Sequence, residues 1–274
     1  MADKLYNEAS IQAIADAIRA KSGKADTMKV GEMAGEIAEL GGYSIDDIFS
    51  GKEPSGDIVI NATTFKSYAL ANRTGITSVT FTNDLSPGGG IMSPFVGCSG
   101  IISVSAPRLT QAKAKLLNGC TNLRTVDMPR LAKINGDQFI EGSKVVYLVF
   151  PAFMYEVCNN ALRNNTLLQA VDLAACTSIG GTAFSGCSVF DTFIIRGGSV
   201  PTLSNINAFT NTPFASGKAG GTLYVPSAMI SSYQSATNWS TILGYDTNSI
   251  VAIEGSQYET QYADGTPIET GGDS

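Results

Sequence analysis

The side chains in this sequence that could act on a substrate are its carboxylates, and three of them lie on or beside predicted strands. Asp127, Asp172 and Asp191 occur in three different segments of alternating apolar and polar residues. A glycosidase needs two carboxyl groups about 5 to 10 Å apart, and neighbouring strands of a sheet lie about 4.8 Å apart. Asp172 and Asp191 would fall on adjacent strands but at different points along them. We therefore expect no catalytic carboxylate pair.

The other residues that enzymes commonly use are missing from the chain or stand in the wrong context. The sequence contains no histidine, which is the usual member of acid/base, triad and zinc arrangements. It contains no phosphate-binding loop of the G-x-x-x-x-G-K-[ST] type, and no helix follows Gly88–Gly90 to receive an anion. The sequence therefore predicts a protein that is not an enzyme, with no catalytic residue, no cofactor and no metal.

The five cysteines do not form a disulfide framework, since an odd number leaves at least one thiol free. Cys98, Cys120 and Cys187 each stand three residues after a large apolar residue, and Gly142 and Asn165 occupy the corresponding places in two related segments. Small apolar side chains at a fixed place in each segment are typical of interior packing. We expect these side chains to stack inside the protein.

A repeat of 22 to 25 residues sets the positions of all these side chains. Six times along the chain, an apolar anchor is followed six, nine and eleven positions later by three more apolar residues. This L-x-x-L-x-L spacing and a period near 22 indicate a leucine-rich-repeat solenoid, mainly β in class. The copies are Leu70/Ile76/Val79/Phe81, Phe95/Ile101/Val104/Ala106, Leu117/Leu123/Val126/Met128, Phe139/Val145/Leu148/Phe150, Leu162/Leu168/Val171/Leu173 and Phe184/Phe190/Phe193/Ile195.

The residues between the apolar positions of each strand should face outward, and most of them are small and polar. The fourth strand differs, because it places Val146, Tyr147 and Val149 together, with Ile102 and Arg124 on nearby turns. Exposed apolar clusters mark contact surfaces more often than chance does. We therefore predict a binding surface at these five residues. The alternative is that the N-terminal helices, the C-terminal tail or a neighbouring subunit covers them.

Residues 7 to 40 are predicted to form two short helices, an α-helical hairpin at the N-terminus. Each helix is about a dozen residues long, which is marginal for an isolated helix in water. The apolar stripes must therefore assemble with other copies, dock onto a partner or cap the solenoid. The residues of these stripes are Ile11, Ile14, Ile18, Val30, Met33, Ile37 and Leu40.

The remaining segments complete the predicted organisation. Residues 1–40 form the assembly or docking module, and residues 41–57, rich in Gly, Ser, Asp and Pro, form a linker. The solenoid with its C-terminal cap spans 58–253. The cap consists of a strand at 222–226, a helical stretch at 228–240 with Met229, Tyr233 and Trp239 over the last turn, and a short strand at 250–253. Residues 254–274 have little to bury and are expected to form a loose tail.

Composition and charge exclude several classes of partner. The chain has 18 basic and 24 acidic residues, a net charge of −6 with no Lys/Arg cluster, so nucleic-acid binding has no electrostatic support. No apolar run approaches the ~18 residues that a membrane-spanning helix needs. The first residues, MADKLYNEAS, lack the features of a secretory signal. We therefore expect a chain made in a cytoplasm, without membrane insertion.

Two resemblances to known families follow from these motifs. Ala183-Phe184-x-Gly186-Cys187-x-x-Phe190-x-x-Phe193 resembles the BspA-type leucine-rich repeat, A-F-x-x-C-x-x-L-x-x-[VI]-x-[LI]-P, and the segment from Tyr224-Val-Pro to Asn238-Trp-Ser resembles the end of such domains. Ile11-Gln-Ala-Ile-Ala-Asp-Ala-Ile-Arg-Ala-Lys-Ser-Gly-Lys with Met33-Ala-Gly-Glu-Ile-Ala is similar to an N-terminal module of phage and prophage structural proteins of Gram-positive gut bacteria.

The resemblances imply a virion structural protein, a fibre or receptor-binding component on the head or the tail. In that interpretation residues 1–40 bind other copies, as a homotrimer, or other virion proteins. The solenoid is displayed on the virion surface and binds a glycan or a protein of the host cell. A bacterial cell-surface adhesin is the alternative, because the same repeat occurs in adhesins, and a glycan-degrading enzyme is the third hypothesis.

Overall fold

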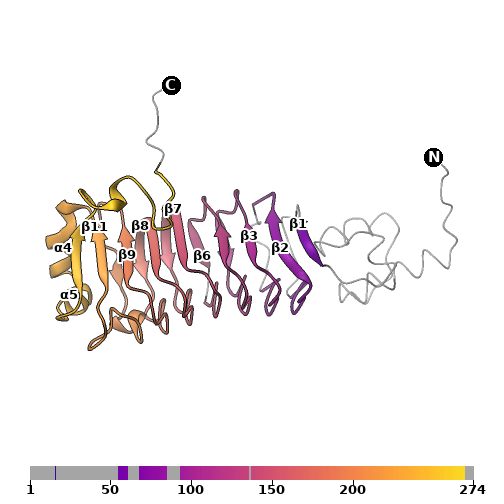
Figure 1. Cartoon of the computed structure of the whole chain (residues 1–274), viewed down its shortest axis with the longest axis horizontal. Helices are drawn as coiled ribbons and strands as arrows, with labels where there is room; N and C mark the ends of the chain where they lie inside the picture. The colour runs from indigo at the N-terminus through magenta and orange to yellow at the C-terminus, as the bar shows by residue number, and fades with distance from the viewer. Residues whose placement is uncertain (1–15, 17–54, 61–67, 85–92, 136, 269–274) are drawn as a thin grey trace, which may run out of the picture.

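The computed structural model shows a mainly β solenoid whose strands repeat from turn to turn (Figure 1). It describes residues 16, 55–60, 68–84, 93–135 and 137–268. The predicted helical hairpin, including Ile11, Ile14, Ile18, Val30, Met33, Ile37 and Leu40, lies outside the described residues apart from Asp16. The predicted fold class, a mainly β leucine-rich-repeat solenoid, is confirmed for the repeat region.

Every strand pairs in parallel with the equivalent strand of a neighbouring turn, as stacked coils of one chain must. The first face of the coil contains nine strands: β1 (Gly56–Ile60), β2 (Ile76–Phe81), β3 (Ser103–Ser105), β5 (Thr125–Asp127), β7 (Tyr147–Val157), β8 (Ala170–Ile179), β9 (Thr192–Ile195), β11 (Thr222–Val225) and β12 (Ser249–Ala252). Because β1 begins at Gly56, the last two residues of the predicted linker belong to the solenoid.

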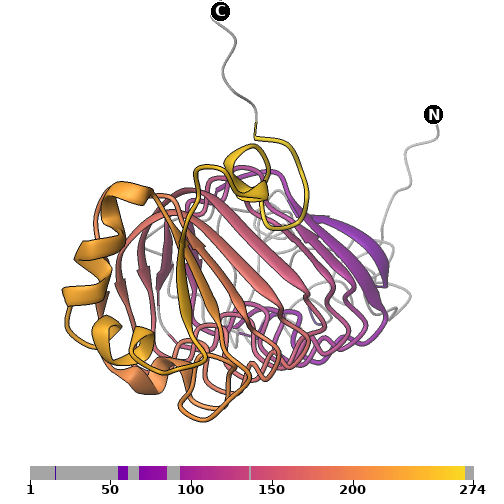
Figure 2. The same cartoon turned by 60° about the vertical axis from the view of Figure 1, so that its left-hand side comes forward.

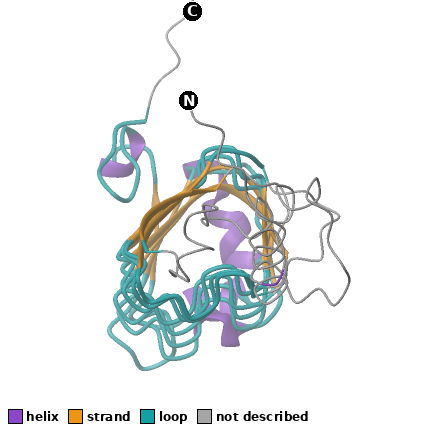
Figure 3. Ribbon diagram, turned by 90° about the vertical axis from the view of Figure 1, so that its right-hand side faces the viewer, coloured by secondary structure: helices purple, strands orange, loops and turns teal. Residues whose placement is uncertain are grey.

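A second face meets the first at a bend. It contains β4 (Gln111–Lys113), β6 (Lys133–Asn135) and β10 (Thr202–Leu203), together with the second halves of β7 and β8. The pairing of β7 with β8 changes register between Phe150 and Phe153, on either side of Pro151. Seen down the long axis, the two strand faces and a side of loops enclose the core (Figure 3).

The apolar positions of the repeat fill that core. The predicted interior column is fully buried, with exposed fractions of 0% at Ile76, Ile101, Leu123, Val145, Leu168 and Phe190. Twenty-two-residue spacing therefore identified the inward side chains correctly. At the C-terminal end, Phe209 of the 3-10 helix η1 (Ile206–Phe209) packs against Phe184, Phe190 and Trp239.

Each turn contains a residue in the left-handed backbone region just before its Cys position. Gly119 has a φ of 74°, a conformation that costs a residue with a side chain more than it costs glycine. Asparagine, which tolerates this region better than most residues, replaces glycine in the other turns. The equivalent residues are Asn72, Gly97, Gly142, Asn164, Gly186 and Asn211.

The Cys position is held by a hydrogen bond to the preceding turn. The thiols of Cys98, Cys120 and Cys187 donate to the carbonyl oxygens of Leu70, Phe95 and Leu162, at 2.8, 3.4 and 3.0 Å. Asn165 replaces the thiol with an amide, whose Nδ2 donates to the carbonyl oxygen of Ile140 at 2.8 Å. The predicted packing role of this column is confirmed, and hydrogen bonding adds to it.

The fourth turn departs from the predicted register. The amide of Leu117 donates to the carbonyl of Phe139, and the amide of Ile140 donates to the carbonyl of Ala161, so Ile140 is the anchor equivalent to Leu117. The predicted anchor Phe139 is one residue early, although it is buried. Consequently Ser143, and not Gly142, occupies the Cys position, where its amide and hydroxyl both donate to Asn165 Oδ1.

The end of the solenoid is closed by short helices, as predicted. These are η2 (Ser227–Met229), α4 (Ile230–Ser235) and α5 (Trp239–Leu243). Tyr233 and Trp239 are buried over the last turns, with ring centroids 5.1 Å apart, and Met229 is partly buried. The predicted strands at 222–226 and 250–253 correspond to β11 and β12.

None of the five cysteines forms a disulfide and all five are buried, so we expect their thiols to be unreactive in the folded protein. Burial raises the pKa of Cys176 and that of Cys187 to about 12, and the thiolate is the reactive form. At about pH 8, Ellman's reagent should modify almost no thiol in the native chain while it modifies all five in the urea-unfolded chain. Rapid reaction of the native chain would contradict this packing.

Candidate binding surface

The outward positions of the first face form continuous rows along the solenoid, because the strands are stacked in register. One row aligns Val59, Thr80, Ser105 and Asp127 on β1, β2, β3 and β5. Hydroxyl and carboxylate groups bond to each other across the turns: Ser105 Oγ donates to Asp127 Oδ2 at 3.0 Å. The hydroxyls of Thr77 and Ser78 both donate to Asp57 Oδ1 and lower its pKa. This part of the face is regular, polar and open to solvent.

The residues predicted as a binding site lie on this open part. Ile102 is 46% exposed, Tyr147 is 43% exposed and Arg124 is exposed, whereas Val146 and Val149 are half-buried. The amide of Arg124 donates to the carbonyl of Ile102, which places these two residues on adjacent turns. Tyr147 and Val149 lie at the start of β7, and Val146 directly precedes it. We call these five residues the open patch.

An interruption in the sheet divides the open patch, with Ile102 and Arg124 on one side of it and Val146, Tyr147 and Val149 on the other. The described strands of the first face form two separate sheets, one ending at β5 and the other containing β7. The path from Ile140 to Val145 is one residue shorter than the path from Leu117 to Leu123, so the fourth turn cannot keep the spacing of the third. Lys144 N still donates to Leu123 O at 2.8 Å. The interior residue Val126 of β5, beside this interruption, is only partly buried.

A polar contact holds the tyrosine of the open patch. The hydroxyl of Tyr147 donates to Gln169 Oε1 at 3.2 Å on the next turn. Lys144 Nζ donates to Asn122 Oδ1 at 2.7 Å beside it. The patch therefore offers an exposed ring and aliphatic side chains within a polar surround, an arrangement suited to contact with another molecule.

The C-terminal part of the same face is covered, which the sequence analysis did not predict. Residues 253–268, which we call the strap, leave β12 and run back across the outside of β8, β9 and β11 (Figures 1 and 2). They include the 3-10 helix η3 (Gln257–Glu259), which lies outside the sheet (Figure 3). The expectation of a loose tail from residue 254 is therefore wrong up to residue 268, because Tyr258 and Ile253 pack against Ile194.

The strap buries outward positions that were expected to be solvated. Asp172 is 1% exposed, Ala170 is 3% exposed and Ile194 is 0% exposed. Arg196, at the end of β9, forms an ion pair with Asp172, with Nε to Oδ1 at 2.8 Å and Nη2 to Oδ2 at 2.7 Å. Burial raises the pKa of the Asp172 carboxyl, and the bonds from Arg196 and from the amide of Ala263 oppose that rise.

The three predicted strand carboxylates do not converge. Asp172 lies opposite Ile194 in the parallel register, and Asp191 accepts from its neighbour Thr192 at 2.9 Å. Asp127 belongs to the separate sheet that ends at β5. The described part of the chain contains no group of three or more Cys, Asp or Glu side chains placed to hold a metal ion.

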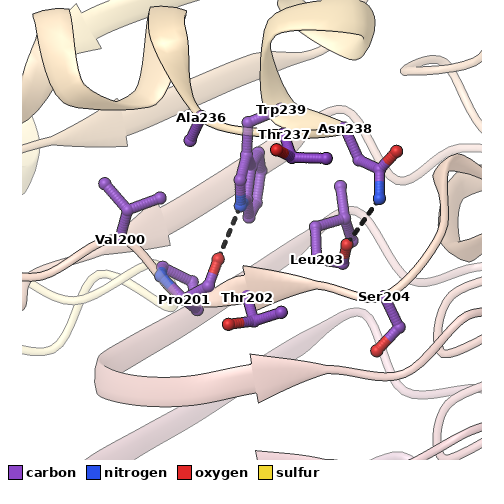
Figure 4. A pocket seen from close by; sticks show the side chains of 9 residues that line it. All are labelled: Val200, Pro201, Thr202, Leu203, Ser204, Ala236, Thr237, Asn238 and Trp239. Atoms are coloured by element: carbon purple, nitrogen blue, oxygen red, sulfur yellow. Dashed lines mark hydrogen bonds between the residues drawn. The ribbon is translucent and has the colours of Figure 1, made fainter.

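A hollow of about 460 Å³ lies between β10 and the loop that leads into α5 (Figure 4). Two of its polar side chains have partners in the chain, since Trp239 Nε1 donates to Pro201 O at 2.8 Å and Asn238 Nδ2 donates to Leu203 O at 2.7 Å. The other lining residues are Val200, Thr202, Ser204, Ala236 and Thr237. No lining residue titrates near neutral pH, so these contacts close the end of the second face.

The helices that the structure describes are too short or too polar to cross a bilayer.

Comparison with known proteins places the repeats in a family. A model described as the BspA type leucine rich repeat region matches residues 92–215 in six copies. No curated protein matches the chain. A crystal structure of a leucine-rich repeat protein from Bacteroides ovatus ATCC 8483 is similar, with 14% identity and a TM-score of 0.43, over 59% of this chain and 48% of that one. The chain thus spans about half the length of that protein. The stacked turns therefore form a leucine-rich-repeat solenoid, and residues 92–215 within it match repeats of the BspA type.

Proposed function

We propose that this chain is a non-enzymatic attachment protein that binds a host-cell surface through the open patch. The observation that carries the proposal is the exposure of Ile102 and Tyr147 on a face whose other outward side chains are mostly polar. Solvent-exposed apolar groups within a polar surround mark contact sites, and tyrosine is frequent among the residues that dominate binding energies. The partner is a glycan or a protein of the host surface.

The proposal contains no catalytic step and no cofactor. Asp172, the most buried of the candidate carboxylates, is paired with Arg196 and lies beneath the strap. Asp127 accepts a hydrogen bond from Ser105 on the exposed face. These carboxylates have structural partners, and the register keeps Asp172 and Asp191 apart along their strands. This arrangement supports a binding role over glycan hydrolysis.

In this proposal the chain is part of a phage virion, as a fibre or receptor-binding component of the head or the tail. Residues 1–40 resemble the N-terminal module of phage structural proteins. In this proposal they join three copies into a homotrimer or dock onto other virion proteins. The solenoid then projects from the virion surface, without contact to nucleic acid and without insertion into a membrane.

A bacterial cell-surface adhesin is the second candidate, because the BspA-type repeats suit either carrier. Immunogold labelling of purified particles and of whole producing cells separates the two. Label on particles, with the chain present among virion proteins by mass spectrometry, supports the virion role. Label on cells alone overturns it and leaves the attachment function with the adhesin.

Exchanging Tyr147 and Val149 for serine is expected to abolish attachment without unfolding the chain. Tyr147 points outward and Val149 is only half-buried, so the loss of unfolding free energy should stay below ~1.5 kcal/mol. Binding of the labelled chain to host cells should fall by at least ~10-fold, as the loss of a central contact does. The matched control is Val59→Ser, an outward valine on β1 that is 64% exposed.

If the double variant binds host cells as well as the wild-type chain does, the open patch has no attachment role. If the Val59→Ser control loses binding to the same extent, the contact is spread over the whole face and the assignment to β7 is wrong. Circular dichroism of both variants shows whether the solenoid is intact.

A further inference from the structure

The part of the first face that the strap covers forms hydrogen bonds to the backbone of the strap. Arg196 Nη1 donates to the carbonyl oxygen of Tyr258 at 2.7 Å, and Nη2 donates to that of Gln261 at 3.0 Å. Asp172 Oδ2 accepts from the amide of Ala263 at 3.0 Å. The ion pair between Asp172 and Arg196 therefore binds two carbonyl oxygens and one amide of the strap, all within residues 258–263. Such charge-assisted bonds are stronger than bonds between neutral groups.

Two tyrosine side chains of the strap add shape to this recognition. The ring of Tyr258 packs edge-on against Tyr224 of β11, with centroids 4.7 Å apart, and covers Ile194. The ring of Tyr262 lies 5.2 Å from the guanidinium carbon of Arg196, close enough for a cation–π interaction. Tyr258 therefore contacts β9 and β11, and Tyr262, four residues later in the strap, contacts Arg196.

The site is organised by the solenoid and not by the strap. Asp172 lies on β8 and Arg196 follows β9, and their two-point ion pair fixes both side chains on neighbouring turns. Tyr224 is held on β11, in register with Ile194. Because the solenoid supplies all of these groups, a preformed peptide site remains when the strap moves away. Preorganisation of this kind lowers the cost of binding.

We propose that the outer face of β8, β9 and β11 is a peptide-binding site, which the strap occupies in cis and which accepts the strap sequence in trans from a second copy of this chain. The ligand is a segment with tyrosines four residues apart, bound through its backbone. This site is distinct from the open patch and does not depend on the attachment function.

The covalent connection of the strap to β12 explains why the strap of the same chain normally occupies the site. The strap follows β12 directly, with Gly255 in the left-handed region at a φ of 80° and open space around it. A short connection between a ligand and its site gives an effective concentration in the millimolar range or above. A free peptide at micromolar concentration therefore cannot displace the intact strap. It should bind once the tyrosines of the tethered strap are removed.

The test uses the full-length chain carrying Tyr258→Ser and Tyr262→Ser, which weakens the strap but leaves Asp172, Arg196 and Tyr224 unchanged. A fluorescein-labelled peptide of residues 253–268 is titrated and its anisotropy measured. We expect saturable binding to the double variant, at least ~10-fold tighter than to the wild-type chain. Adding Arg196→Met to the double variant should abolish it. The matched control is Tyr155→Ser, an exposed tyrosine on β7, which should behave as wild type.

Two results would overturn the proposal. The first is absence of peptide binding to a folded double variant, and the second is equally tight binding to the double variant and to a folded triple variant. Hydrogen exchange of the wild-type chain provides a test that needs no variant. The amide of Ala263 should exchange well before that of Val171 in β8, because the strap opens without the solenoid. If both amides exchange at one common rate, the strap is an inseparable part of the core and the site does not exist.

Discussion

Replacing Leu123 with aspartate is expected to unfold the central turns of the solenoid. Leu123 is fully buried, in a column between Ile101 and Val145. The substitution leaves a cavity and places a carboxylate where no cation can reach it. Loss of a buried leucine costs about 2 to 5 kcal/mol, and burial of an unpaired charge adds to that. The expected loss in free energy of unfolding is at least ~4 kcal/mol, measured by urea denaturation.

The size of this effect follows from how a repeat array is stabilised. One turn contacts only its neighbours, so a turn that cannot pack removes two interfaces at once. Thr121→Asp introduces the same charge two residues earlier, at an exposed position, and should change stability by less than ~0.5 kcal/mol. Similar losses for Leu123→Asp and Thr121→Asp would show that the interior column does not carry the stability of the fold.

The repeat core was predictable from sequence because it depends on local periodicity alone. Every residue of the predicted interior column is buried, and the cap around Trp239 was found from its apolar residues. The inward and outward positions of a strand follow from its alternation. The open patch was placed outward for the same reason, and Tyr147 is exposed as expected.

The fourth turn was misaligned because two apolar residues, Phe139 and Ile140, stand side by side. The apolar pattern alone does not show which of the two is the anchor of the fourth turn. The left-handed Gly142 could have decided the question, because it stands two residues after the anchor, as Gly119 does after Leu117. Glycine and asparagine at that position mark the backbone conformation and therefore fix the register better than the apolar anchor does.

The strap was missed because its contacts are far apart in sequence. Asp172 and Ala263 are 91 residues apart, and no local pattern connects them. The segment from 254 to 268 is short and mostly polar, so its composition favours an unpacked tail. Its binding depends on backbone carbonyls and one guanidinium group, which leave no signal in composition. Asp172, between the apolar residues Val171 and Leu173, gave no sign of it either, because Asp127 has similar flanking residues and is exposed.

The first face therefore has two parts, one open to solvent and one covered by the strap. From β1 to the first half of β7 it is open, with hydroxyl rows and the open patch, whereas the strap covers β8, β9 and β11. The boundary lies near Gln169, which accepts from Tyr147 on the open side. Tyr147 and Val149 lie opposite Ala170 and Asp172 in the parallel register, so the open patch adjoins the part of the face that the strap covers.

Replacing Arg196 with methionine is expected to destabilise the chain by about 3 to 5 kcal/mol near neutral pH. Methionine retains most of the apolar stem but leaves the carboxylate of Asp172 buried at 1% exposure without its partner. The adjacent groups that remain are the amide of Ala263 and the carboxyl of Asp264, and Asp264 raises the pKa of Asp172 further. Urea unfolding of the full-length variant measures the loss.

The loss should shrink as the pH falls, and the sign follows from the pKa of Asp172. Burial already raises that pKa in the folded chain, and removal of Arg196 takes away the interactions that lower it. A folded-state pKa above the unfolded value of about 3.9 means that the folded chain holds the proton more tightly. The contribution of Asp172 to stability is then most favourable below about pH 4 and falls as the pH rises, by at most ~1.4 kcal/mol per unit. Arg124→Met, at an exposed position of the same face, is the control and should cost less than ~0.5 kcal/mol at either pH. An equal loss for Arg196→Met at about pH 4 and pH 7 would show that Asp172 is not left charged and buried, because the strap has released it to water.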